Sequence, residues 1–119
     1  MINSRDLNEL LPVVKKHADM FLMKCKELNL NVLVTSTYRD KEWQDFLYSK
    51  GRTLKIDKAT GKKIGTVTGL KGGLSPHQYR IALDVCRNEK GREYNNDDKF
   101  FEQVGAVAKS FGFVWRWRL

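Results

Sequence analysis

Apolar residues recur along the first third of the chain with two spacings, one typical of helices and one typical of strands. Over residues 12–29 they follow one another every three or four positions, which is the spacing of one helix face, and Pro12 suits the first turn of such a helix. A β-branched run over residues 32–35 is too short and too β-prone for a helix, so residues 31–37 predict a buried strand. The chain therefore begins with a helix that leads into a strand.

The segment after this strand predicts a second helix and then an exposed hairpin. Asp40 can cap a helix, and Gly51 follows its end in the position where glycine commonly closes helices. Tyr38 and Arg39 then lie at a strand-to-helix junction, where side chains commonly face a cleft. Residues 52–74 contain two short β-prone pieces around a turn signal, and this pattern predicts the hairpin.

The last third of the chain predicts a second strand and a third helix. Apolar residues alternate over residues 81–87, which places Asp84 on one face of a strand. Asn95 or Asn96 can cap the helix that follows, and Gly112 closes it.

These elements predict an α+β fold within one domain over residues 1–119, a length that leaves no room for a second domain. A small antiparallel sheet is expected to hold strands at residues 32–35 and 81–86. The helices are expected to pack on one face of that sheet through three phenylalanines, Phe21, Phe46 and Phe101.

Composition narrows the class of protein further. Lys and Arg number 22 against 14 Asp and Glu, so the formal net charge of +8 favours an anionic partner such as nucleic acid, an anionic membrane or a polyanionic cell wall. No apolar run approaches the ~18–20 residues needed to span a bilayer, and the N-terminus lacks a signal-peptide profile, so we expect a protein made in the cytoplasm without membrane insertion. Cys25 and Cys86 are too few for a disulfide framework and are expected to be reduced core residues.

An acidic residue inside the second strand is the first sign of chemistry. Asp84 lies among apolar neighbours, where a carboxylate costs several kcal/mol unless it is paired or binds a metal. His77 lies in a proline-stiffened loop just before this strand, and imidazole with carboxylate is a ligand pair that suits zinc. A surface histidine and an aspartate paired with one of the many cations would produce the same spacing, so the spacing alone leaves both interpretations open.

Three sequence elements resemble one known family. The segment Ser75-Pro76-His77-Gln78-Tyr79-Arg80-Ile81-Ala82-Leu83-Asp84 resembles the Ser-x-His-x-x-Gly-x-Ala-x-Asp motif of the zinc D,D-carboxypeptidases and L-alanyl-D-glutamate endopeptidases, a family that includes phage endolysins and vancomycin-resistance peptidases. Residues 36–40 with Gln44 resemble its upstream Ser-x-Tyr-Arg element, and residues 111–115 resemble the strand that opens its Trp-rich segment. These elements occur in the family's order and span nearly the whole chain.

The resemblance implies a fold, a cofactor and a substrate. The fold would be that of the zinc D-Ala-D-Ala peptidases, also called hedgehog-like, and the activity would be cleavage of peptidoglycan stem peptides. His77 and Asp84 would hold Zn²⁺, and Arg39 would stabilise the negative charge on the substrate carbonyl oxygen. Residues implied to contact substrate are Ser75, Tyr38 and Gln44. The positive charge would concentrate such an enzyme at the anionic polymers of a bacterial cell wall.

Two departures from the family pattern bear on this interpretation. Arg80 stands where the motif has glycine, and the family's third zinc ligand, a histidine after the Trp-rich strand, has no counterpart before the chain ends at Leu119. His17 is the other histidine and is expected to be structural, whereas no spacing selects a substitute among the acidic residues Glu89, Glu93, Asp97 and Asp98. We therefore expect a C-terminally shortened peptidase with weak activity or none.

Two alternatives stay open from the sequence. A catalytically inactive cell-wall-binding protein would keep the same motifs. A basic nucleic-acid-binding module is suggested by the alternation of tryptophan and arginine over residues 115–118, but Trp115 continues an apolar stretch and is expected to be buried, so nucleic acid is not the expected partner.

Overall fold

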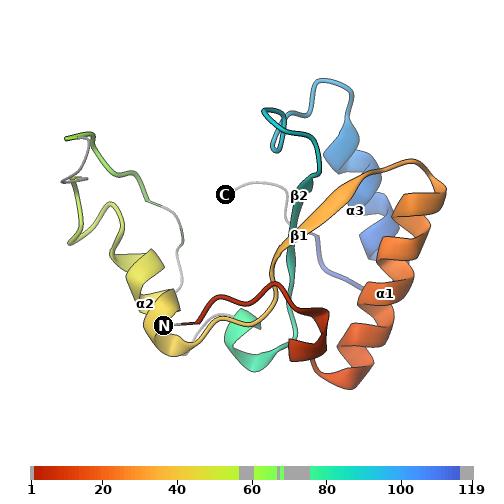
Figure 1. Ribbon diagram of the computed structural model, residues 1–119, viewed down its shortest axis with the longest axis horizontal. Coiled ribbons are helices and arrows are strands. Elements are labelled where there is room, and N and C mark those ends of the chain that lie inside the picture. The colour runs from red at the N-terminus through yellow and green to blue at the C-terminus, as the bar shows by residue number, and fades with distance from the viewer. Residues whose placement is uncertain (1, 57–60, 67, 69–75, 116–119) are drawn as a thin grey trace.

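The α+β class is confirmed by a computed structural model, which describes residues 2–56, 61–66, 68 and 76–115. Two helices, α1 and α3, lie together on one side of a two-stranded sheet, and α2 lies on the other side (Figure 1). In chain order the elements are the 3-10 helix η1 (Leu7–Glu9), α1 (Pro12–Glu27), β1 (Val32–Ser36), α2 (Lys41–Ser49), the 3-10 helix η2 (Pro76–Tyr79), β2 (Asp84–Arg87) and α3 (Phe100–Ser110). No helix in the described parts of the chain has both the length and the apolar content to cross a membrane.

The sheet pairs β1 with β2 in antiparallel fashion, and one irregularity changes its register. Val34 faces Val85, but the next pair is Ser36 with Asp84, so Thr35 is an extra residue on β1. Such a bulge shifts the side chains that follow it to the opposite face. Ser36, rather than Thr35, is therefore the neighbour of Asp84 across the sheet.

The hydrophobic core lies between α1 and α3. Phe21 and Cys25 of α1 pack against Phe101 and Val104 of α3, and all four are almost completely buried. Both cysteines are free and buried, as predicted. Trp115 packs half-buried against the same cluster.

The prediction that Phe46 packs with the core phenylalanines is wrong. Phe46 is half-buried, and its ring centroid lies 5.5 Å from that of Trp43 on the same helix. The Lys50 ammonium lies 5.0 Å from the centroid of the Phe46 ring. The fully buried residue of α2 is Gln44. Because α2 lies away from α1 and α3, its apolar side chains contact one another instead of the shared core.

Several elements differ in extent from their predictions. The second strand begins at Asp84 instead of residue 81, and the Ile81 amide donates back to the Pro76 carbonyl at 3.4 Å. The third helix begins at Phe100, and its N-cap position is Lys99 instead of the predicted Asn95 or Asn96, although the Asn96 side chain accepts a hydrogen bond of 2.8 Å from the Phe101 amide.

The hairpin predicted over residues 52–74 is seen in part. Ile56 and Lys63 form an antiparallel bridge, and the Ile64 amide donates to the Lys55 carbonyl at 2.8 Å. The turn signal between them and most of residues 67–75 lie outside the described residues. Residues 113–115 do not form the strand that the resemblance implied.

Candidate functional site

His77 and Asp84 meet at the start of β2. The η2 turn carries His77, which is 7% exposed, and its Nε2 lies 3.1 Å from Oδ1 of Asp84. Its other ring nitrogen, Nδ1, lies 2.9 Å from the Thr37 carbonyl oxygen. Because a carbonyl only accepts hydrogen bonds, Nδ1 carries the proton, and Nε2 is the atom that faces the carboxylate.

This arrangement fits a cation between the two side chains. Nε2 and a carboxylate oxygen attract each other only when a positive charge lies between them, either a proton carried by Nε2 or a metal ion. Two ligands of a tetrahedral zinc ion stand roughly 3.4 Å apart, close to the separation seen for His77 and Asp84. A histidine that donates its other nitrogen to a backbone carbonyl also has the tautomer and support typical of metal ligands.

Arg39 contacts the second carboxylate oxygen of Asp84. Its Nη2 forms an ion pair with Oδ2, its Nε donates to the Ser36 hydroxyl at 3.1 Å, and its Nη1 donates to Oε1 of Gln44 at 3.4 Å. The Arg39 amide also donates to the His77 carbonyl at 3.4 Å, which ties the η2 turn to the start of α2. One oxygen of Asp84 therefore faces an imidazole and the other a guanidinium.

The surroundings of Asp84 favour its ionised form. Burial raises the pKa of this carboxyl, but the contacts with His77 and Arg39 outweigh burial and lower the pKa below its ordinary value of 3.8. The side chain stays 46% exposed, so one side of the carboxylate remains open to solvent. At neutral pH Asp84 is thus an ionised carboxylate that is open to solvent on one side.

Of the remaining residues predicted for the site, Gln44 lies beside Arg39, whereas Tyr38 packs on Arg80. Gln44 is completely buried and its amide nitrogen lies 3.4 Å from the Thr68 hydroxyl. The hydrogen bonds described above for His77 and Asp84 do not involve Tyr38. The Tyr38 ring packs against Arg80, whose guanidinium carbon lies 4.0 Å from the ring centroid. Ser75 lies outside the described residues.

Ser36 and Thr37 are site residues whose roles the sequence did not reveal. Ser36 belongs to the Ser-x-Tyr-Arg element, but only the bulge in β1 shows that its hydroxyl meets Arg39. Thr37 contributes a backbone carbonyl, for which no side-chain motif exists.

The residues considered as a third metal ligand do not join this pair. No group of three His, Cys, Asp or Glu side chains suited to a metal occurs in the portion of the chain that the structure describes. His17 lies on α1 and its Nδ1 is 2.9 Å from the Val13 carbonyl oxygen. Within the described residues, His77 and Asp84 are therefore the two candidate ligands.

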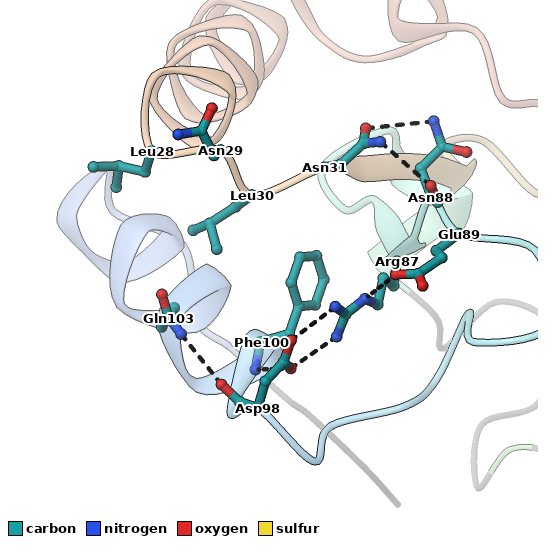
Figure 2. A pocket seen from close by; sticks show the side chains of 10 residues that line it. All are labelled: Leu28, Asn29, Leu30, Asn31, Arg87, Asn88, Glu89, Asp98, Phe100 and Gln103. Carbon is teal, nitrogen blue, oxygen red and sulfur yellow. Dashed lines mark hydrogen bonds and ion pairs between the residues drawn. The ribbon is translucent and has the colours of Figure 1, made fainter.

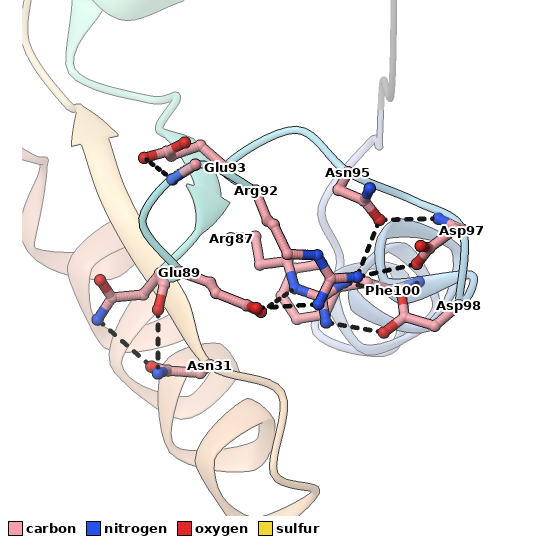
Figure 3. A network of polar contacts seen from close by, with 11 residues as sticks. Asn31, Arg87, Glu89, Arg92, Glu93, Asn95, Asp97, Asp98 and Phe100 are labelled. Atoms are coloured by element: carbon pink, nitrogen blue, oxygen red, sulfur yellow. Dashed lines mark hydrogen bonds and ion pairs between the residues drawn. The ribbon is translucent and has the colours of Figure 1, made fainter.

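Glu89, Asp97 and Asp98 belong to a separate network of charges after β2, and Glu93 beside it accepts a hydrogen bond from the Gly91 amide (Figure 3). Arg87 contacts both carboxylate oxygens of Asp98 at 2.8 and 2.7 Å, and Arg92 contacts Glu89 and Asp97. A cavity of about 550 Å³ adjoins this network, between the end of α1 and the start of α3 (Figure 2). Its one lining cation, Arg87, is already paired, so the cavity lacks a free charge that would select a ligand.

Comparison with known proteins finds one family over most of the chain. The family model described as VanY: D-alanyl-D-alanine carboxypeptidase matches residues 8–119. The chain is 32% identical over 117 residues to the peptidoglycan L-alanyl-D-glutamate endopeptidase CwlK of Bacillus subtilis (strain 168). That match covers 91% of this chain and 65% of the relative, so the chain spans just under two thirds of the relative's length.

Proposed function

The chain belongs to the VanY family of D-alanyl-D-alanine carboxypeptidases, and on this premise we propose that it is a zinc-dependent peptidase that cleaves the peptides of peptidoglycan. The observation that carries the proposal is the pair formed by His77 Nε2 and Asp84 Oδ1, 3.1 Å apart and each oriented by a further contact. The relative CwlK is named as a peptidoglycan endopeptidase, which supports the same substrate class.

His77 and Asp84 would hold the zinc ion. When bound, zinc supplies Lewis acidity toward a peptide carbonyl and toward water. The Thr37 carbonyl keeps the His77 ring in the required tautomer, and Arg39 holds the far oxygen of Asp84. These contacts orient both ligands before the metal arrives.

Arg39 would stabilise the charge that develops on the substrate carbonyl oxygen. A guanidinium carries five N–H donors, and Ser36, Gln44 and Asp84 engage three of them. Two donors therefore remain for substrate, on a side chain whose orientation is already determined. A donor aimed at such a charge lowers a reaction barrier by about 3 kcal/mol.

The basic surface would hold the protein at the anionic polymers of a bacterial wall, as in a phage lysin. Lys55, Lys62 and Lys63 are exposed on the segment that follows α2, and residues 50–66 contain six Lys or Arg against one Asp. Attraction to a polyanion through such a segment falls as salt screens the charges.

Zinc binding tests the proposal directly. We expect competition with a chromogenic chelator to show one zinc site in the 119-residue chain, lost in His77→Ala and Asp84→Ala and kept in the matched control His17→Ala. Because two ligands are described, the affinity should fall below that of a complete three-ligand site.

Peptide cleavage provides the second test. Purified peptidoglycan and two synthetic peptides, one ending in D-Ala-D-Ala and one containing an L-Ala-D-Glu bond, are incubated with and without zinc, and products are identified by mass spectrometry. We expect slow, zinc-dependent cleavage that Arg39→Ala reduces by about 10²–10³-fold. Cleavage that is equally fast in His77→Ala would refute the proposed mechanism.

A further inference from the structure

The N-terminal segment lies beside the start of α2 (Figure 1), and its backbone bonds to residues 37–40, the junction that carries Arg39. The Ser4 amide donates to the Tyr38 carbonyl at 2.8 Å, and the Thr37 amide donates to the Ser4 carbonyl at 2.7 Å. The Asp40 amide donates to the Ile2 carbonyl at 3.1 Å. Residues 2–4 thus pair with residues 37–40 in the manner of a short antiparallel strand, and they precede residue 8, where the family match begins.

The Asn3 side chain reaches from this segment to a buried hydroxyl of the site. Its Oδ1 accepts a hydrogen bond of 2.7 Å from Ser36, which is 2% exposed. The same hydroxyl accepts the hydrogen bond from Nε of Arg39 at 3.1 Å. Asn3, Ser36 and Arg39 therefore form a continuous chain of hydrogen bonds that ends at the site.

The direction of these hydrogen bonds gives Asn3 its role. A serine hydroxyl has one proton, and here Asn3 receives it, so a lone pair of the Ser36 oxygen points toward Arg39. Without an acceptor in the place of Asn3, the hydroxyl is free to rotate and to turn its proton toward the Nε–H donor. Donation in one direction along such a chain also strengthens each bond in it.

We propose that Asn3 is a positioning residue that acts through Ser36 to hold the Arg39 guanidinium against Asp84. Its consequence for catalysis rests on the function proposed above, but the positioning itself does not depend on zinc or on substrate. The backbone pairing of residues 2–4 uses main-chain atoms alone, so the role of the Asn3 side chain can be separated from the docking of the segment.

Exchange of the Arg39 Nε proton with water measures this positioning in zinc-free protein. The resonance is identified in ¹⁵N-labelled protein by its loss in Arg39→Lys. We expect Asn3→Ala to speed the exchange about tenfold, the effect of losing one hydrogen bond to a charged group. Asn3→Asp, which keeps the acceptor, should preserve slow exchange, and the exposed neighbour Asn8 provides the matched control Asn8→Ala.

Two further measurements keep the inference falsifiable. The amide protons of Ser4 and Thr37 report the backbone pairing and should keep their protection in Asn3→Ala. In a Ser36→Ala background, Asn3→Ala should not raise the Arg39 exchange rate any further, because the hydrogen-bonded link through the Ser36 hydroxyl is already lost. The proposal would be overturned if the Arg39 Nε proton exchanged at an unchanged rate in Asn3→Ala. It would also be overturned if faster Arg39 exchange came with loss of protection at the Ser4 and Thr37 amides.

The outcome is distinguishable from failure of the proposed function. Faster Arg39 exchange in a protein that cleaves no peptidoglycan would support the positioning role and contradict the enzyme assignment. In an active protein, Asn3→Ala should lower kcat with KM nearly unchanged, since Arg39 is proposed to act on charge that develops during the reaction. Cleavage with unchanged Arg39 exchange would leave the enzyme assignment standing and remove Asn3 from the site.

Discussion

Arg80 takes a left-handed backbone conformation, with φ of +63°, at the position where the resembled family motif has glycine. We predict that Arg80→Gly destabilises the protein less than Arg80→Ala does, the reverse of the usual order. The reason is that alanine keeps the strained backbone and loses the arginine contacts, whereas glycine loses the contacts but relieves the strain.

The contacts of the Arg80 side chain determine how much stability Arg80→Ala loses. Its guanidinium donates to the Glu9 carbonyl at 3.0 Å, forms an ion pair with the Glu9 carboxylate and packs 4.0 Å from the Tyr38 ring. The hydrogen bond contributes about 1 kcal/mol. The ion pair, with both side chains 40% exposed, contributes about 0.5 kcal/mol after solvent screening. The packing on Tyr38 adds about 0.5 kcal/mol. Arg80→Ala should therefore cost about 2 kcal/mol.

Strain relief decides the difference between the two variants. A left-handed backbone costs a residue with a side chain about 1–2 kcal/mol, and the greater freedom of glycine in the unfolded chain offsets about 0.4–1 kcal/mol of the gain. Arg80→Gly should then be more stable than Arg80→Ala by about 0.5–1 kcal/mol.

Urea unfolding followed by tryptophan fluorescence measures both free energies. Lys16, exposed on α1, provides the matched control, since there alanine should be more stable than glycine by about 1 kcal/mol. If Arg80→Ala proves as stable as Arg80→Gly while the Lys16 pair shows its normal order, the left-handed conformation does not strain this backbone and the reasoning is refuted.

Three further outcomes are expected. Gly105→Ala should lower the free energy of unfolding by about 1–2 kcal/mol and shift the tryptophan emission. The added Cβ would lie 2.5 Å from the Trp115 ring, and this overpacking outweighs the usual gain from alanine in a helix. Unchanged emission would contradict this prediction. Hydrogen bonds from Arg87 lower the pKa of Asp98 to about 2. This pair therefore stabilises the fold above pH 4, and its contribution is lost as the pH falls toward 2. The stability of Asp98→Asn, measured over the same pH range, should lack this loss. Burial raises the pKa of Cys25 to about 11, so iodoacetamide at pH 8 should modify it only after unfolding in urea.

Local patterns in the sequence were enough to predict the elements that stand on their own. The apolar spacing of α1, the β-branched run of β1 and the Asp40 cap of α2 each involve residues within a few positions of one another. The free cysteines were predicted for the same reason, since burial followed from their apolar neighbours. The motifs also named Arg39, Gln44, His77 and Asp84, which the structure brings together, while their chemical roles stay predictions.

Contacts between distant segments could not be predicted in this way. Phe46 fits the apolar pattern of a core residue, yet the path of the chain takes α2 away from α1 and α3. Arg80 was noted only as a departure from the family motif, and no local pattern indicated its partner Glu9, 71 positions earlier in the chain.

The sequence by itself determined the helices, the strands and the identity of the ionisable groups, because short-range sterics, capping and apolar periodicity act within a few residues. Only the tertiary structure decided how those groups meet. The extra residue at Thr35 turns Ser36 toward Asp84, and the N-terminal segment brings Asn3 to Ser36 across 33 positions. Register and segment pairing depend on the packing of the whole chain, since a shift of one residue in a strand reverses which face every later side chain occupies.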